Sequence, residues 1–298
     1  MVSILSQDLD DFEFFIFDDG SIDRSQGIVK RFASQDHRIK LFQGNHKGHA
    51  HWLNEGVRMA SAEYIARMDA DDISLPQRFR RQLDYLRRES NCVAVGCDLL
   101  QIDEDGDPVM TVKHDVEHAK IEADLLDGGL GVISHPASML RRSTILAIGG
   151  YKEEYEYIED FDLWLRLAEQ GHLANLPEVL FKYRLHHTNV IYSGVERQRQ
   201  LADRIIMEAR TRRSLKPLPH SIWNFTAPTL VERHRTWAWQ AAGSGYYRTA
   251  LKHAVKSFQI APLSLGSWWA LFFSLTPRSL RQVLKHALSV TGLLKVAR

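Results

Sequence analysis

Short apolar runs alternate with amphipathic stretches along the first 186 residues, and this alternation restricts the chain to few architectures. The expected strands cover residues 12–17, 39–42, 64–68 and 93–102. The expected helices cover residues 23–33, 48–60 and 76–89, with Asp23 as the N-cap of the first and Pro76 opening the last. Strands that alternate with helices in this way favour an α/β fold with a mostly parallel sheet.

Two of the predicted strands end in acidic residues. Asp18 and Asp19 follow the first strand, and Asp69 and Asp71 follow the strand at 64–68. Ligands of α/β sheets bind beyond the carboxyl ends of strands, where both acidic turns would lie. Two carboxylates two residues apart can face one hard cation, such as Mg²⁺ or Mn²⁺. The alternative is a solvated acidic turn at the second position and an Asp-Gly turn with a helix cap at the first.

Two positions further along the chain could also carry chemistry. Glu159 and Asp160 open a predicted amphipathic helix, and Asp160 could act as a general base that takes a proton from an acceptor hydroxyl. Carboxylates are also favoured at helix N-termini by the helix dipole, so capping is the alternative. His186 follows the last predicted strand and could be a further metal ligand, or simply a packed or surface histidine.

Charge divides the chain into two parts. Residues 1–196 hold 21 Lys+Arg and 34 Asp+Glu, a net charge of −13, whereas residues 197–298 hold 17 and 3, a net charge of +14; the two sum to +1. The acidic part coincides with the predicted α/β domain, 1–196. The basic part, 197–298, reads as an all-α appendage whose segment 239–246 is similar to the first helix of a tetratricopeptide hairpin.

The basic appendage suggests a partner of opposite charge. An anionic membrane surface fits, whereas nucleic acid is not expected because the basic residues belong to no known nucleic-acid module. The most apolar stretch, 260–275, is too short and too interrupted to span a bilayer, and the N-terminus does not read as a signal peptide.

Taken together, the motifs resemble the family 2 glycosyltransferases of the GT-A fold. The resemblance covers about residues 3–190 in the family's order and spacing. It is carried by Asp18-Asp19-Gly20-Ser21, Leu53-Asn54, the segment from Ala66 to Ser74, His135-Pro136, Gly149-Gly150-Tyr151, the segment from Glu159 to Arg166, the segment from Leu176 to Leu180, and the segment from Tyr183 to His186.

The resemblance implies a role for each acidic motif in binding a nucleotide-sugar. Asp18 and Asp19 would lie in the donor turn, with Asp19 contacting the base, and Asp69 would lie by the ribose. Asp71 would bind the Mn²⁺ or Mg²⁺ ion that bridges the diphosphate. His186 would complete the metal and diphosphate site.

The implied activity is that of an inverting glycosyltransferase with Asp160 as the catalytic base. It would move a sugar from a nucleotide-diphosphate sugar of the UDP type to a hydroxyl of a glycan or lipid-linked acceptor, in the biosynthesis of cell-envelope polysaccharide. We expect a cytoplasmic protein, peripheral on the inner face of the plasma membrane through residues 197–298. The alternatives are a catalytically impaired GT-A-like domain that binds a membrane or a partner, and a nucleotidyltransferase of similar fold.

Family members usually carry one more strand and helix ahead of the segment that begins at Ser3. The sheet of this chain is therefore expected to contain an unpaired strand near its centre.

Overall fold

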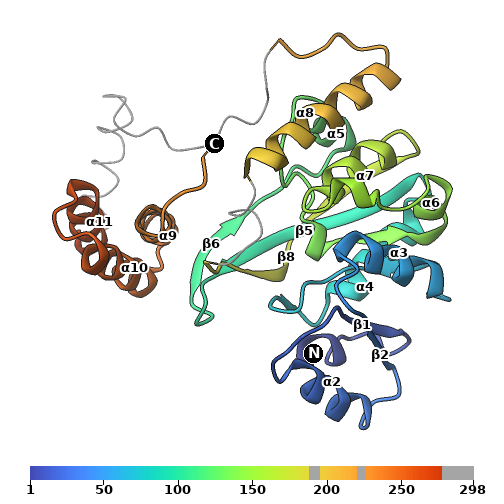
Figure 1. Cartoon of the computed structure of the whole chain (residues 1–298), viewed down its shortest axis with the longest axis horizontal. Coiled ribbons are helices and arrows are strands. Elements are labelled where there is room, and N and C mark those ends of the chain that lie inside the picture. The colour runs from blue at the N-terminus through green and yellow to red at the C-terminus, as the bar shows by residue number, and fades with distance from the viewer. Residues whose placement is uncertain (188–194, 220–225, 277–298) are drawn as a thin grey trace. The chain divides into compact units, whose positions relative to one another are not determined.

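The computed structural model describes residues 1–187, 195–219 and 226–276, and its chain divides into two compact units (Figure 1). The first unit consists of Met1–Leu99, Val112–Tyr183 and Thr188–Thr226, and the second of Leu100–Thr111, Arg184–His187 and Ala227–Arg298. The strands are β1 (Phe14–Asp18), β2 (Ile39–Gln43), β3 (Tyr64–Ala66), β4 (Ile73–Ser74), β5 (Cys92–Ile102), β6 (Pro108–Val112), β7 (Met139–Arg141) and β8 (His172–Arg184). The helices are α1 (Val2–Leu5), α2 (Ser25–Ala33), α3 (His49–Met59), α4 (Arg78–Arg88), α5 (His118–Leu126), α6 (Arg142–Ala147), α7 (Glu159–Leu167), α8 (Val195–Arg212), α9 (Leu230–Ser244), α10 (Tyr247–Ile260) and α11 (Leu265–Leu275), with short 3₁₀ turns at His135–Ala137 and Glu153–Tyr155.

The strands form two separate sheets. The larger has the order β3-β7-β5-β8-β4, with β6 paired to β5, and the smaller consists of β1 and β2. The β1–β2 pair is parallel, whereas β7 is antiparallel to both β3 and β5, and β4 is antiparallel to β8. The α/β prediction is confirmed, but the large sheet is mixed rather than mostly parallel. The antiparallel pairs come from two short strands, β7, which runs against both of its neighbours, and β4, which runs against β8.

Side chains alternate between the two faces of the large sheet and build two cores. Leu140 and Leu173 pack with α3, α5, α6, α7 and α8, while Met139 and Ala174 pack with α1 and α4. This period of two is what a strand with both faces buried requires. The large sheet is therefore covered by helices on both faces.

Two long polar side chains of α4 are buried beneath the sheet. Nη2 of Arg78 donates to the carbonyl oxygens of Arg67 (2.6 Å) and Ser138 (3.0 Å), and Nε2 of Gln82 donates to those of Val95 (3.1 Å) and Ala137 (2.7 Å). Burial lowers the pKa of Arg78 to about 10, which still leaves the guanidinium charged at neutral pH. These bonds connect the end of β3, the interior of β5 and the residues just before β7 to one helix.

Two helices begin later than the sequence suggested. For α2 the N-cap is Arg24, and Asp23 instead accepts a hydrogen bond from the N–H of Ser25 at 2.9 Å. For α4 the predicted first residue, Pro76, lies in a turn. The N–H of Leu75 still pairs with the carbonyl of Leu180 at 2.9 Å, so the extended backbone of β4 continues to Leu75 and delays the helix.

In the second unit, α9 and α10 form a helical hairpin against which α11 packs (Figure 1). Thr229 and Glu232 make a capping box at the start of α9, and Gly245 ends it with a φ of 88°. Ala238, Ala254 and Ala270 meet where the three helices contact one another. Small residues at these positions allow the helix axes to approach closely.

The hairpin turn between β5 and β6 carries three carboxylates around one lysine. Nζ of Lys252 lies 2.5 Å from Asp103 and 3.0 Å from Asp105, and it also contacts Asp107. Oxygens of the three aspartates lie within 4.8 Å of one another, a spacing that could suit a metal ion. The ammonium group of Lys252 already supplies a positive charge to this cluster, which we call the Lys252 cluster.

A buried pair of histidines continues from this cluster. Nε2 of His253 lies 3.0 Å from Asp103, and Nδ1 of His253 lies 3.0 Å from Nδ1 of His234. A carboxylate only accepts, so His253 donates to Asp103 from Nε2. Burial lowers the pKa of His234 to about 4, so His234 is neutral at physiological pH.

The two compact units differ from the division at residue 196 expected from charge. Helix α8 packs with α5 and α7 through Ala202, Ile205, Ile206 and Ala209, and so belongs to the first unit. The domain pair 1–196 and 197–298 stays a prediction. Within the described ranges, no helix has both the length and the apolar character needed to cross a membrane.

We expect Lys252→Met to destabilise the protein by about 2–3 kcal/mol at neutral pH, less than for a fully buried pair because Asp105 and Asp107 reach solvent. Burial alone would raise the pKa of Asp103, but hydrogen bonds from His253 and Lys252 lower it well below its ordinary value. This stabilisation is complete above the unfolded-state pKa of about 3.9 and is lost as the pH falls below it. Urea unfolding at several pH values measures the difference.

Lys256→Met, one turn later on α10, is the matched control and should change the free energy of unfolding far less. The difference between Lys252→Met and the parent should narrow in acid. If the difference in unfolding free energy stays constant down to a pH below the pKa of a free aspartate, this account of the cluster is contradicted.

Candidate active site

The turn after β3 carries the predicted metal and ribose carboxylates. The N–H of Arg67 donates to the carbonyl of Ser138 at 3.0 Å, which extends the pairing of β3 towards β7 by one residue. The chain then turns, leaving the Asp69 side chain 38% exposed and Asp71 exposed. Both carboxylates therefore lie beyond the carboxyl end of a strand, where the sequence predicted them.

Asp69 is the first member of a chain of polar contacts. Nη2 of Arg67 lies 2.6 Å from Oδ1 of Asp69 and 3.1 Å from Nε2 of His49. Nδ1 of His49 lies 2.8 Å from Oε1 of Glu159. Because a guanidinium only donates, His49 accepts at Nε2 and donates its Nδ1 proton to Glu159. These four residues, which we call the Arg67 chain, connect the turn after β3 to α3 and α7.

Asp160, the predicted base, follows the last member of this chain. It is half-buried at the start of α7, and its Oδ1 accepts a hydrogen bond from the N–H of Phe161 at 2.8 Å. Burial raises the pKa of Asp160, and the negative charge of Glu159 raises it further, while the positive charge of Arg67 opposes part of the rise. A raised pKa makes this carboxylate a better proton acceptor than an ordinary aspartate.

Glu159 itself is kept ionised by its partners. Burial alone would raise its pKa, but the hydrogen bond from His49 and the charge of Arg67 lower it below its ordinary value. The two adjacent carboxyl groups are thus shifted in opposite directions. Such a divergence is typical of a pair in which one member carries charge and the other exchanges a proton.

The donor-turn aspartates Asp18 and Asp19 hold backbone groups. Oδ1 of Asp18 accepts from the N–H of Ser21 at 2.7 Å, a bond that lowers its pKa. The two oxygens of Asp19 accept from the N–H groups of Lys47 and Gly48, each at 2.9 Å. Asp19 therefore ties the end of β1 to the start of α3.

A second carboxylate, from the loop before α7, accepts from the backbone at the same helix start. Oε1 of Glu156 accepts from the N–H of His49 at 3.1 Å. Gly48 has a φ of 93°, and a Cβ atom there would lie 2.8 Å from the same oxygen. Only glycine allows both the backbone angle and the approach of Glu156. The first residue of α3, His49, is positioned by this contact.

The side chain of Asn54, on α3, packs against the glycine pair that precedes Tyr151. Asn54 donates from Nδ2 to the carbonyl of Tyr151 and accepts at Oδ1 from its N–H, both at 2.8 Å. Gly149 and Gly150 have φ values of 83° and 75°. A Cβ atom on Gly150 would lie 2.4 Å from Oδ1 of Asn54. The pair therefore fixes the loop that leads to Glu156 and Asp160.

A buried histidine and the buried Tyr151 pack together at the start of this loop. Nε2 of His135 lies 2.9 Å from the hydroxyl of Tyr151, and the His135 ring packs edge-on against Trp164 of α7. Burial lowers the pKa of His135 far below its usual value and raises that of Tyr151, so both are neutral at physiological pH.

The structure thus brings some of the predicted residues together and adds others. The Arg67 chain links Asp69 to Glu159, the residue that precedes Asp160, and the roles of Arg67 and His49 in it were not anticipated. Their only sequence signal is position: Arg67 stands two residues before Asp69, and His49 directly follows Gly48. His186 belongs to the second compact unit, so its place beside Asp71 stays a prediction.

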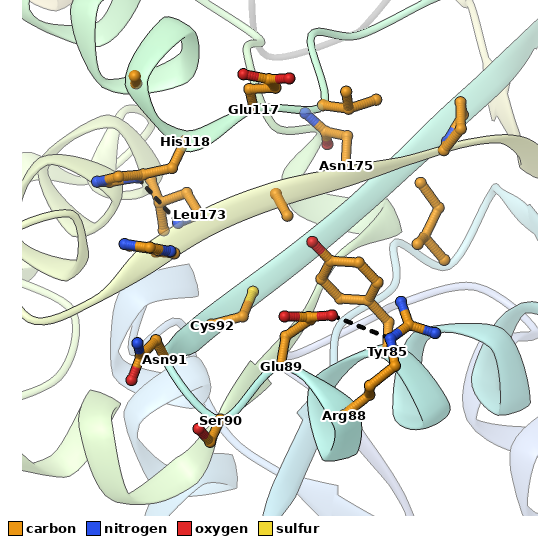
Figure 2. A pocket seen from close by; sticks show the side chains of 16 residues that line it. Tyr85, Arg88, Glu89, Ser90, Asn91, Cys92, Glu117, His118, Leu173 and Asn175 are labelled. Atoms are coloured by element: carbon orange, nitrogen blue, oxygen red, sulfur yellow. Dashed lines mark hydrogen bonds and ion pairs between the residues drawn. The ribbon is translucent and has the colours of Figure 1, made fainter.

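A hollow of about 760 Å³ lies elsewhere in the first unit, where β5 and β8 begin (Figure 2). Cys92 and Asn175 line it, together with His118, whose Nδ1 accepts from the N–H of Leu173 at 3.1 Å. Because β3 and β5 both run antiparallel to β7, they point in the same direction. The start of β5 therefore lies at the opposite end of the strands from Asp69, which follows β3. The hollow is therefore separate from the candidate active site.

Comparison with known proteins agrees with this architecture. The sequence profile of glycosyl transferase family 2 matches residues 1–148. The O-antigen biosynthesis glycosyltransferase WbnJ of Escherichia coli is 32% identical over 197 residues, which cover 65% of this chain and 76% of WbnJ. Matches to three further curated relatives span 62% to 68% of their lengths, so the chain corresponds to about two thirds of each.

Two solved structures share the fold. TarS 1–349 of S. aureus, in complex with UDP-GlcNAc, has a TM-score of 0.57 at 14% identity and covers 92% of this chain and 74% of its own. The mannosyltransferase PcManGT of Pyrobaculum calidifontis, in complex with GDP-Man and Mn²⁺, has a TM-score of 0.55 at 16% identity, with 99% and 75% covered. The predicted GT-A fold is confirmed by these likenesses.

We expect Gly150→Ala to destabilise the protein by about 3–4 kcal/mol. The change forces a left-handed backbone on alanine, at about 1–2 kcal/mol, and its Cβ displaces Asn54 from two hydrogen bonds worth about 1 kcal/mol each. Equilibrium unfolding in urea gives the free energy.

Gly149→Ala is the matched control, because its φ is also positive but a Cβ there meets nothing within 4 Å. It should show the backbone cost alone. Equal destabilisation by the two substitutions would mean that the Asn54 contact contributes nothing.

Proposed function

Because the chain belongs to glycosyltransferase family 2, we propose that it transfers a sugar from a nucleotide-diphosphate sugar of the UDP type to a hydroxyl of a glycan or lipid-linked acceptor, with inversion. The observation that carries the proposal is the position of Asp160. Its pKa is raised, and it lies next to Glu159, at the end of the Arg67 chain that begins at Asp69. The contacts from Asp69 thus end at Glu159, the sequence neighbour of the proposed proton acceptor.

In the proposed reaction, the acceptor hydroxyl loses its proton to Asp160 while its oxygen bonds to the anomeric carbon. The bond from that carbon to the diphosphate breaks on the opposite face, and the diphosphate leaves with the electron pair. A single displacement of this kind inverts the anomeric centre and needs no enzyme nucleophile. A positioned base contributes about 10²–10⁴-fold to such a step.

We assign the donor to the turns after β1 and β3. Asp18 and Asp19 would border the base, and Asp69 the ribose. The ion pair with Arg67 uses one oxygen of Asp69 and so favours the ribose role over metal binding for this residue. The solved relatives are named with UDP-GlcNAc and GDP-Man, so the UDP type is our proposal for this chain.

The donor set of the turn fits a hard divalent ion. The carboxylate of Asp71 is exposed, and oxygen ligands are those that Mn²⁺ and Mg²⁺ prefer. We propose that Asp71 and His186 hold such an ion, which when bound would stabilise the charge of the leaving diphosphate. The Lys252 cluster is the less suitable place, because an ammonium group already contacts all three of its carboxylates.

For pathway and localisation we propose cell-envelope polysaccharide biosynthesis by a cytoplasmic enzyme bound peripherally to the inner face of the plasma membrane. The O-antigen name of WbnJ and the basic region 197–298 support this assignment.

A donor screen tests the activity. Purified protein is incubated with Mn²⁺ and UDP- or GDP-sugars, and release of nucleoside diphosphate is followed. Pyrophosphate release from a nucleoside triphosphate and a sugar phosphate would instead identify a nucleotidyltransferase. Donor binding with no transfer to any glycan or lipid-linked acceptor would identify an impaired domain.

We expect Asp160→Asn to bind the donor normally but to lose at least ~100-fold in kcat, because only proton abstraction is removed. Calorimetry measures the donor binding, and product formation measures the transfer. Transfer at the parent rate would show that Asp160 only caps α7 and that the base lies elsewhere.

A second readout for the same residue comes from pH. The parent should lose kcat/KM as Asp160 becomes protonated, at a higher pH than an ordinary aspartate with a pKa of about 3.9. Glu159→Gln removes a charge that raises the pKa of Asp160, so the acid limb should move to lower pH. An unmoved limb in an active Glu159→Gln variant would argue that another group titrates.

We expect Asp71→Ala to abolish the Mn²⁺-dependent part of nucleoside diphosphate binding. Calorimetry with and without Mn²⁺ measures this part for each variant. Asp105→Ala, in the Lys252 cluster, is the control and should bind as the parent does. The assignment fails if Asp71→Ala keeps the parent's response to Mn²⁺ or if Asp105→Ala loses it.

A further inference from the structure

Helix α11 places its small side chains inward and most of its large apolar ones outward. Ser267, Ala270 and Ser274 are buried, and Oγ of Ser267 lies 2.9 Å from Oγ of Ser257 on α10. Leu265, Trp268, Trp269, Phe272 and Leu275 are exposed, with Leu275 at 63%. At about 100° per residue, these five side chains fall within an arc of about 120°, opposite the three small ones.

This arrangement is the reverse of an ordinary surface helix, which buries its large apolar residues. Two large residues turn inward: Phe273 meets the ring of Trp239 at 4.3 Å between centroids, and Leu271 packs against the alanine core of the three helices. Two of the ring contacts of the outward face are within this unit: Trp268 packs edge-on against Phe258 of α10, and Trp269 packs edge-on against Phe272. Contiguous apolar surface of this kind marks an interaction site.

The polar part of Trp268 is already satisfied. Its indole N–H donates to the carbonyl of Pro262 at 2.9 Å, which leaves the ring itself exposed. Leu263, beside it in the turn before α11, is 96% exposed. The exposed face therefore continues from the turn along the whole helix.

Charge identifies the occupant of this face. From Arg233 to the last residue the chain holds ten Lys and Arg residues and no Asp or Glu. Apolar and aromatic side chains in a wholly cationic segment are typical of helices that lie in the interface of an anionic bilayer. An apolar protein partner would need no such excess of positive charge.

We propose that the outward face of α11 (Leu265, Trp268, Trp269, Phe272 and Leu275) docks on an anionic lipid surface, with the helix parallel to the membrane plane. This inference gives residues to the peripheral association proposed above and rests on that localisation. It does not depend on sugar transfer, and its test uses no donor.

The experiment is flotation of the full chain with vesicles of phosphatidylcholine containing increasing phosphatidylglycerol, at low and high salt. Binding should increase with phosphatidylglycerol and weaken in high salt, because surface charge is screened. The affinity of the variant Trp268→Ser/Trp269→Ser/Phe272→Ser for these vesicles should be lower than that of the parent by at least about tenfold. Far-UV circular dichroism checks that it folds as the parent does.

The matched control replaces exposed apolar residues of the first unit, as Ile22→Ser/Met59→Ser/Val116→Ser, and should bind vesicles as the parent does. The proposal is overturned if vesicle binding does not change with the phosphatidylglycerol content. It is also overturned if the two triple variants bind vesicles equally well. A parent that binds no vesicles and forms a dimer in sedimentation which the α11 variant loses overturns it too, because the face would then join two copies of the chain. An active enzyme that fails to float would overturn the docking face alone.

Discussion

The candidate active site and the packing beneath it both depend on the contacts of Arg67. Its guanidinium binds Asp69 and His49, its N–H pairs with Ser138, and its carbonyl accepts from the buried Arg78. One residue therefore joins the sheet, the turn after β3 and the starts of two helices. A buried cation can be held only where its partners are in place, so the packing beneath the sheet and the spacing of the carboxylates above it are coupled.

The contacts of Arg67 also help to shift the pKa values of two neighbouring carboxyl groups in opposite directions. Glu159 is stabilised as an anion by His49 and Arg67, and its charge in turn favours the protonated form of Asp160. Neither residue would have this property alone. The geometry is maintained by parts that do not touch the reacting atoms, namely the glycine pair 149–150, Asn54 and the buried ring of Tyr151.

The sequence predicted what depends on local pattern. The strand ends that carry Asp19 and Asp69 and the start of α7 at Glu159 follow from periodicity and turn residues. Strand direction did not follow, because β7 is three residues long and its pairing with β3 and β5 is set by distant segments. The late start of α4 has the same origin, since the partner of Leu75 is more than one hundred residues away.

The Arg67 chain lay beyond sequence reasoning for a related reason. His49 and Glu159 are 110 residues apart, and nothing in the local pattern of either predicts a shared proton. Acidic spacing also did not predict the Lys252 cluster. The most compact group of carboxylates in the described ranges surrounds Lys252, outside the motif that spacing singled out.

At the start of α3, three successive N–H groups already donate to carboxylates, two to Asp19 and one to Glu156. In many α/β proteins such a helix start is where a phosphate group binds. Here it is occupied by the protein's own anions, which would repel a phosphate instead of attracting it. Under the metal assignment proposed above, the charge of a bound diphosphate would be compensated by a dissociable ion instead, and donor affinity would then follow the ionic composition of the surroundings.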